Sequence, residues 1–212
     1  GGAFAINEQA SFAPDAAHRW MGSAAMDRNG DLAVGYNVSS ASVFPSIRYA
    51  GRLASDPVGG LFQGETNLWA GSGSQTDVQS RWGDYSMLAV DPVDDCTFWL
   101  VAEYYSTNSV DSWQTRVGMF KFSACTPAPQ GALQGTVTDA SSGLPIAGAT
   151  VSTANGFLRT TSGAGTYSMS LPVDTYQVTA SAPGHGSKTV SGIVIANGVT
   201  NTQNFALPPV PV

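Results

Sequence analysis

The chain has 212 residues, of which 9 are Lys or Arg and 15 are Asp or Glu, so its formal net charge is −6. Charged residues make up only 11% of the sequence and no basic cluster occurs, which argues against nucleic acid as a partner. The 24 glycines and 12 prolines are typical of an all-β secreted protein. Apolar runs are short, so we expect no membrane span.

The two halves of the chain differ in composition. Residues 1–125 hold 13 of the 15 acidic residues, 7 of the 9 basic residues and all five tryptophans. Residues 126–130 contain two prolines, which favour an extended linker. We therefore expect a first domain at 1–125, a linker at 126–130, a second domain at 131–208 and a Pro-rich tail at 209–212.

The first half contains an internal repeat, because Arg19-Trp20 recurs as Arg81-Trp82 at an offset of 62 residues. Each pair is followed by a short apolar segment and a turn, of which Asn29-Gly30 is a strong hairpin signal. Two antiparallel meanders are predicted, at about 10–60 and 80–125, as in consecutive β-propeller blades. The predicted strands are 21–26, 32–36 and 47–53 in the first meander, and 83–90, 98–104 and 116–122 in the second.

A family resemblance supports propeller blades. Ser106–Trp113 has the spacing of the sialidase Asp-box, a turn between the outer strands of a blade. Residues 10–125 resemble the C-terminal blades of sialidase-like (BNR/Asp-box type) β-propellers of secreted bacterial proteins. The resemblance implies further blades on another chain or on a cleaved precursor segment, since a closed ring needs about four or more. Alternatively, the open sheet edges pair in self-assembly. Besides the Asp-box-like segment, the resemblance to these propellers rests on His18–Asp27, Phe44–Tyr49, Arg81–Ser86 and Asp91–Trp99.

The second half resembles the carboxypeptidase regulatory-like domain, a transthyretin-like β-sandwich, over residues 131–208. Leu133 and Val137 share one face of a strand, and Tyr176, Val178 and Ala180 share one face of another, which is the period of a half-buried sheet. The resemblance rests on Gly135–Asp139, Gly143–Val151, Gly165–Tyr167, Leu171–Pro172, Tyr176–Ala180 and Ala182–His185, and the chain departs from the family pattern at Thr161, Asp174 and His185. The predicted fold class is all-β, with antiparallel propeller-blade-like sheets followed by a β-sandwich domain.

The two cysteines, Cys96 and Cys125, both lie in the first half. In a Ser/Thr/Gly-rich chain they favour one disulfide over a metal site, which would need four closely spaced ligands. A reduced pair of buried thiols is the alternative.

The best candidate for a ligand site is the group Arg81, Trp82, Asp84 and Tyr85. On the first strand of a blade these side chains suit a sugar hydroxyl or a carboxylate, through bidentate Arg contacts and aromatic stacking. An Arg81–Asp84 pair that braces the start of the strand is the alternative.

The sequence predicts no cofactor, no metal and no catalytic residue. Ca²⁺ ligation by two acidic turns is the alternative, although neither turn has the EF-hand order. His18 and His185 are isolated, which gives no support to a zinc site or a Ser-His-Asp triad. The two acidic turns contain Asp27, Asn29 and Asp31, and Asp91, Asp94 and Asp95.

We therefore expect a non-catalytic C-terminal portion of a secreted bacterial multidomain protein, at the cell surface or outside the cell. Its roles would be structural, in surface attachment or in glycan or matrix binding, within an extracellular assembly. The start at Gly1-Gly2 without Met predicts a processed product or a fragment. The alternative is a fragment of a sialidase-like glycoside hydrolase whose catalytic residues lie mostly on other blades.

Overall fold

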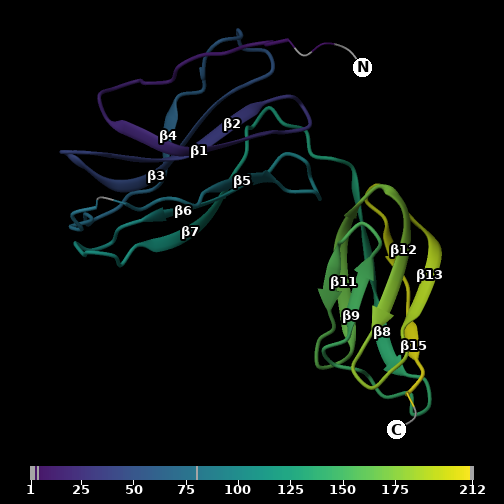
Figure 1. Ribbon diagram of the computed structural model, residues 1–212. Coiled ribbons are helices and arrows are strands. Elements are labelled where there is room, and N and C mark those ends of the chain that lie inside the picture. Colours follow the sequence, from purple (N-terminus) through teal and green to yellow (C-terminus); the bar gives the residue numbers. More distant parts are fainter. Residues whose placement is uncertain (1–2, 4, 80, 211–212) are drawn as a thin grey trace. The chain divides into compact units, whose positions relative to one another are not determined.

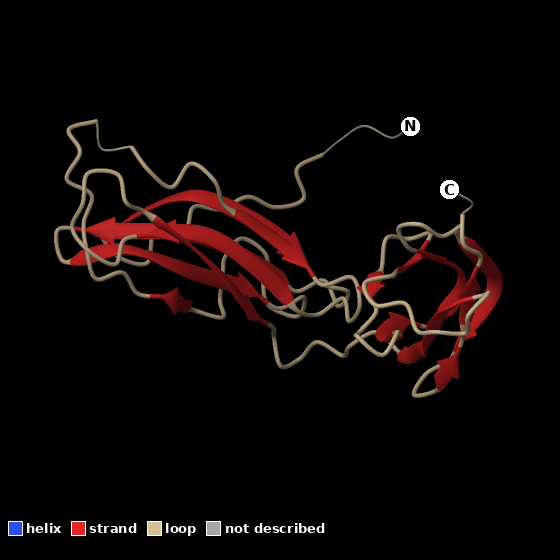
Figure 2. Cartoon of the chain, turned by 90° about the horizontal axis from the view of Figure 1, so that it is seen from below, coloured by secondary structure: helices blue, strands red, loops and turns tan. Residues whose placement is uncertain are grey.

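The computed structural model describes residues 3, 5–79 and 81–210 and divides into two compact units, Gly1–Pro127 and Ala128–Val212. Every regular element in the described residues is a β-strand (Figure 2). The predicted all-β fold class is therefore confirmed. These residues include no helix with the length and apolar character needed to cross a bilayer.

The first unit contains two antiparallel meanders (Figure 1). One sheet has the order β1-β2-β3-β4 and the other β5-β6-β7. The β1–β2 hairpin turns at Asn29-Gly30, where Gly30 adopts a positive φ of 87°. The strands are β1 (His18–Met26), β2 (Leu32–Ser40), β3 (Val43–Arg52), β4 (Glu65–Trp69), β5 (Met87–Val90), β6 (Phe98–Tyr104) and β7 (Gln114–Phe120).

The first sheet has a fourth strand that the sequence did not predict. β4 pairs with β3 after a loop rich in glycine, and it lies beyond residue 60, where the first meander was expected to end. β4 has a polar, largely exposed pattern, so it carries no hydrophobic alternation by which it could be recognised. The Asp-box-like segment Ser106–Trp113 lies in the connection between β6 and β7.

The two sheets of the first unit pack face to face. Their shared core includes Ala33 and Ile47 from the first sheet and Leu88, Phe98 and Leu100 from the second. Just outside this core, a disulfide joins Cys96 and Cys125, whose Cα atoms are 5.7 Å apart. The predicted disulfide is therefore present, and it ties the segment before β6 to the segment after β7.

The second unit is a β-sandwich of two sheets, ordered β10-β9-β12-β13 and β11-β8-β14, with β15 also paired to β8. β8 begins at Gln130, within the segment expected to be a linker. Leu133, Val137, Tyr176, Val178 and Ala180 all lie in its buried core, as the period-two pattern predicts. The strands are β8 (Gln130–Asp139), β9 (Thr150–Thr153), β10 (Leu158–Thr160), β11 (Thr166–Pro172), β12 (Asp174–Ser181), β13 (Lys188–Ile195), β14 (Thr200–Thr202) and β15 (Phe205–Leu207).

An ion pair in the sandwich predicts a pH-dependent stability. His185 Nε2 lies 2.9 Å from Asp139 Oδ2 at the end of β8. Hydrogen bonding to the Pro183 carbonyl and then to Asp139 raises the pKa of His185. Its stabilising effect is therefore complete below the ordinary pKa of about 6.5 and disappears as the pH rises through the raised value.

We expect thermal unfolding of the second unit, followed by circular dichroism, to move to lower temperature over this rise in pH. The change should disappear in His185→Gln. The matched control is His18→Gln, which alters the chain's other histidine and should leave the pH step in place. A step that survives His185→Gln would contradict the assignment.

Candidate functional site

The four residues predicted to form a ligand site lie in the segment before β5, and the structure separates Trp82 from the other three. Arg81 Nη2 lies 2.7 Å from Asp84 Oδ2, and the Arg81 side chain is 75% exposed. Tyr85 is 79% exposed. Trp82 packs edge-on against Trp20, with ring centroids 5.1 Å apart. Trp82 lines a groove that Arg81, Asp84 and Tyr85 do not line.

A buried polar contact holds Trp82 in place. The N–H of the next residue, Gly83, donates to Glu103 Oε2 at 2.9 Å, and Asn37 Nδ2 donates to the Glu103 carbonyl at 2.6 Å. Gly83 has a φ of +77°, and a Cβ there would lie 3.1 Å from Trp20 Nε1. A glycine is thus required for the approach of the two tryptophans.

The two tryptophans line a groove of about 340 Å³ beside the β2–β3 hairpin, which we call the tryptophan groove. Two further hollows, of about 510 and 120 Å³, adjoin it, because Ser40 and Val43 line all three. Its polar groups are three serine hydroxyls, one amide and one imidazole, none of which carries a fixed charge. The remaining lining residues of the groove are His18, Ser39, Pro45, Ser74 and Gln75.

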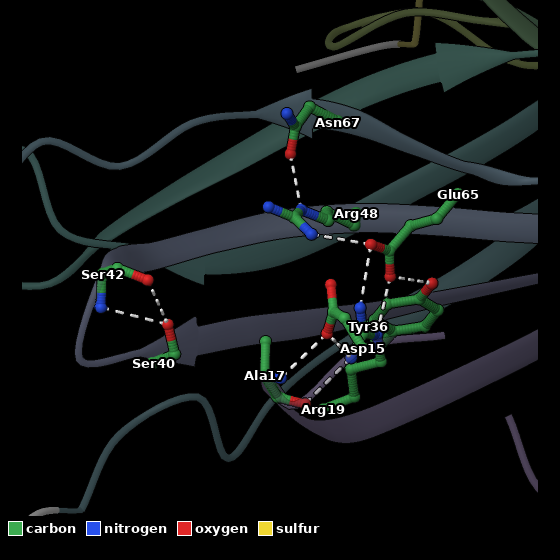
Figure 3. Close-up of polar contacts among 9 residues, drawn as sticks. All are labelled: Asp15, Ala17, Arg19, Tyr36, Ser40, Ser42, Arg48, Glu65 and Asn67. Atoms are coloured by element: carbon green, nitrogen blue, oxygen red, sulfur yellow. Dashed lines mark hydrogen bonds and ion pairs between the residues drawn. The ribbon is translucent and has the colours of Figure 1, made fainter. Parts of the chain in front are cut away.

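A second cluster of polar side chains lies on the face of the first sheet that is turned away from the second sheet, and we call it the Glu65 network (Figure 3). Arg19 Nε donates to Glu65 Oε1 at 2.7 Å, and Arg48 Nη1 donates to Glu65 Oε2 at 2.6 Å. Tyr36 Oη also donates to Glu65 Oε1, at 2.6 Å. The Arg19, Glu65 and Arg48 side chains are 8%, 12% and 17% exposed.

The electrostatics of the Glu65 network fix its protonation states. Burial alone would raise the pKa of Glu65, but hydrogen bonds from Arg19, Tyr36 and Arg48 outweigh it and lower that pKa to about 2. Burial and the hydrogen bond to Glu65 raise the pKa of Tyr36. In a sialidase the nucleophilic tyrosine is activated by a neighbouring carboxylate that acts as a general base. Glu65 is held by two arginines and its pKa is lowered to about 2, so this carboxylate is a weak base. Arg19 is also bound to Asp15 and to the Ala17 carbonyl, so its guanidinium is occupied within the protein.

The acidic turns considered for Ca²⁺ bind their own backbone. Asp27 Oδ1 accepts the N–H groups of Asn29 and Asp31, at 2.9 and 3.0 Å. Asp94 Oδ1 accepts the N–H groups of Cys96 and Thr97, at 2.9 and 2.8 Å. These bonds are the side-chain caps of Asx turns. Within the described residues, no group of three or more His, Cys, Asp or Glu side chains has the arrangement of a metal site.

These observations define a two-unit, all-β, disulfide-containing protein whose second unit is a sandwich. Residues 132–208 match the family model of the carboxypeptidase regulatory-like domain. The predicted carboxypeptidase regulatory-like domain is therefore supported over these residues. No curated protein matches the chain.

Among solved structures, the chain is similar to one described as "The Bacillus anthracis TIE protein", at 14% sequence identity and a TM-score of 0.32. The alignment covers 94% of this chain and 42% of that one, so the chain spans less than half of that structure's length.

Proposed function

We propose that the chain is a non-catalytic C-terminal portion of a secreted bacterial multidomain protein, and that the tryptophan groove binds a neutral carbohydrate chain. The observation that carries this proposal is the pairing of two tryptophan rings with uncharged hydrogen-bonding groups in one groove. Sugar rings offer C–H faces to aromatic rings and hydroxyl groups to Ser and Gln side chains. The adjoining hollows give an elongated surface, which suits a polymer better than a single sugar.

The wider setting belongs to the same proposal. A disulfide and a carboxypeptidase regulatory-like domain are both compatible with an extracellular protein. The two stacked meanders would be blades of a sialidase-like propeller, and the second unit would space or attach them at the cell surface. Catalysis is not part of the proposal, because Glu65, the carboxylate beside Tyr36, is bound by two arginines and is a weak general base.

The test is titration calorimetry of the full chain with soluble neutral polysaccharides and with a sialylated glycan. We expect a neutral polysaccharide to bind, and Trp82→Ala to weaken its affinity by about fivefold or more, since a stacked ring contributes on the order of 1 kcal/mol or more. Ser39→Ala, which removes a hydroxyl from the groove lining, should weaken binding without disturbing the tryptophan pair. The matched control is Trp113→Ala, an exposed tryptophan outside the groove lining.

Two outcomes would contradict the proposal. One is binding that is equally weakened by Trp113→Ala and Trp82→Ala. The other is hydrolysis of a fluorogenic sialoside by the chain that is lost in Tyr36→Phe at an unchanged melting temperature, which would favour the glycoside hydrolase instead.

A further inference from the structure

The face of sheet β5-β6-β7 that is turned away from the first sheet is apolar and exposed. Met87, Trp99, Val117 and Met119 on this face are between 41% and 64% exposed. Ala89 and Val101 are half-buried between them. The six side chains form two rows across the three strands and carry no charge. An exposed apolar patch of this kind on a soluble protein marks an interaction surface.

The internal repeat identifies what kind of surface this is. A row here means the residues that are paired with one another across neighbouring strands. Rows are counted from the first hairpin turn of each meander, so the first row contains Met26 and Leu32 in the first sheet and Val90 and Phe98 in the second. With this count, the second and fourth rows occupy equivalent positions in the two sheets. These rows are Ala25-Ala33-Gly51 and Ser23-Gly35-Tyr49 in the first sheet, and Ala89-Trp99-Met119 and Met87-Val101-Val117 in the second.

In the first sheet, these two rows are covered by another sheet. Tyr49 stacks on Phe120 with ring centroids 3.7 Å apart, and the Ser23 hydroxyl accepts the Leu88 N–H at 2.9 Å. Ala25 and Ala33 pack in the shared core. The second sheet therefore presents outward the same positions that the first sheet uses to bind its neighbouring sheet.

The opposite end of the stack is closed. Arg52, on the outer side of the first sheet, is bound to Glu8 by a 2.9 Å ion pair, and Phe12 packs against Tyr36 with ring centroids 6.2 Å apart. The Glu65 network occupies the same outer side. If a second copy placed this outer side of its first sheet on the apolar rows, the charged groups there would be buried against apolar side chains, which costs free energy. Head-to-tail stacking of copies is therefore disfavoured, and only like faces match.

We propose that two copies of this chain associate through the outer faces of their β5-β6-β7 sheets, related by a two-fold axis. Each sheet then serves as the third layer of the other copy's stack, in the place that the next blade would take in a propeller. A two-fold arrangement suits this surface because the same patch is used on both copies and the assembly closes at two. The association adds a property that the proposed carbohydrate binding does not require, namely two tryptophan grooves in one particle.

The test is sedimentation velocity of the full chain from about 1 to 200 µM, since a small apolar patch predicts a micromolar dissociation constant. We expect a dimer that strengthens with added salt, because each copy carries a net charge of −6 and the Asp91 carboxylate, which accepts the Trp99 indole N–H at 3.0 Å, lies at the edge of the contact. Met119→Lys should be monomeric throughout this range, with an affinity loss of about a hundredfold or more.

The matched control is Met26→Lys. Met26 is also a strand methionine and is 55% exposed, against 64% for Met119, but it belongs to the first sheet. Met26→Lys should remain dimeric, and Met119→Leu should too. Circular dichroism melts establish that each variant is folded. A wild-type chain that stays monomeric at all concentrations overturns the proposal and assigns the face to a sheet of a different polypeptide. A dimer broken by Met26→Lys but not by Met119→Lys overturns it equally.

Discussion

Replacing Glu65 with Gln is expected to lower the free energy of unfolding of the first unit by about 2 to 4 kcal/mol, because it leaves two largely buried arginines without their shared counter-ion. All five tryptophans lie in the first unit, so tryptophan fluorescence during urea unfolding reports on this unit alone. The matched control is Asp84→Asn, which removes the acid of an exposed pair with Arg81. That change should leave the free energy of unfolding almost unchanged, because solvent screens the exposed pair.

The same network predicts a pH dependence. The pKa of Glu65 is lowered to about 2 in the folded chain, so its stabilising effect is complete above the ordinary value of 4.5 and is lost as the pH falls toward about 2. Wild-type stability should therefore fall over this acidic range by more than that of Glu65→Gln. Equal acid sensitivity in the two proteins would show that Glu65 is not ion-paired in solution.

Removing the disulfide by Cys96→Ala with Cys125→Ala is expected to lower the free energy of unfolding of the first unit by about 3 to 4 kcal/mol. The bond closes a loop with a sequence separation of 29, and in the chain-entropy model a loop of this length stabilises by that amount. Tryptophan fluorescence during denaturant unfolding is again the measurement.

A reducing agent provides the control for the disulfide. It should destabilise the wild-type chain to the level of the double variant and leave the double variant unchanged. Thiol labelling of the unfolded, non-reduced chain should find no reactive cysteine. Two reactive thiols, or a double variant as stable as the wild type, would contradict the prediction.

The features that could be predicted from the sequence are those encoded locally. Asn29-Gly30 predicts its hairpin, and the alternation around Val178 predicts a half-buried strand. Both are present, because turn geometry and side-chain alternation act over a few residues. The packing of the sandwich core follows from the same alternation, since each buried side chain lies on a predictable face of its strand.

The candidate sites depend on contacts between distant residues and could not be predicted in this way. Glu65 meets Arg19 across 46 residues of sequence, on a strand with no hydrophobic pattern. The direction of Trp82 is set by Gly83 and the distant Asn37. Arg81, Trp82, Asp84 and Tyr85 are almost consecutive in the sequence. Gly83 between them has a positive φ, so Trp82 points in a different direction from the residues that follow.

The position of β15 has a consequence for how the second unit is made. β15, at the end of the unit, pairs in parallel with β8, its first strand, and Phe205 lies opposite Val137. The sheet that contains β8 therefore closes only after the last strand has been synthesised, and contacts between chain ends this far apart form slowly, on a millisecond to second scale for all-β domains. Until β15 is available, Val137 has no partner on that side, so the second unit can complete its folding only after residues 205–207 have been synthesised.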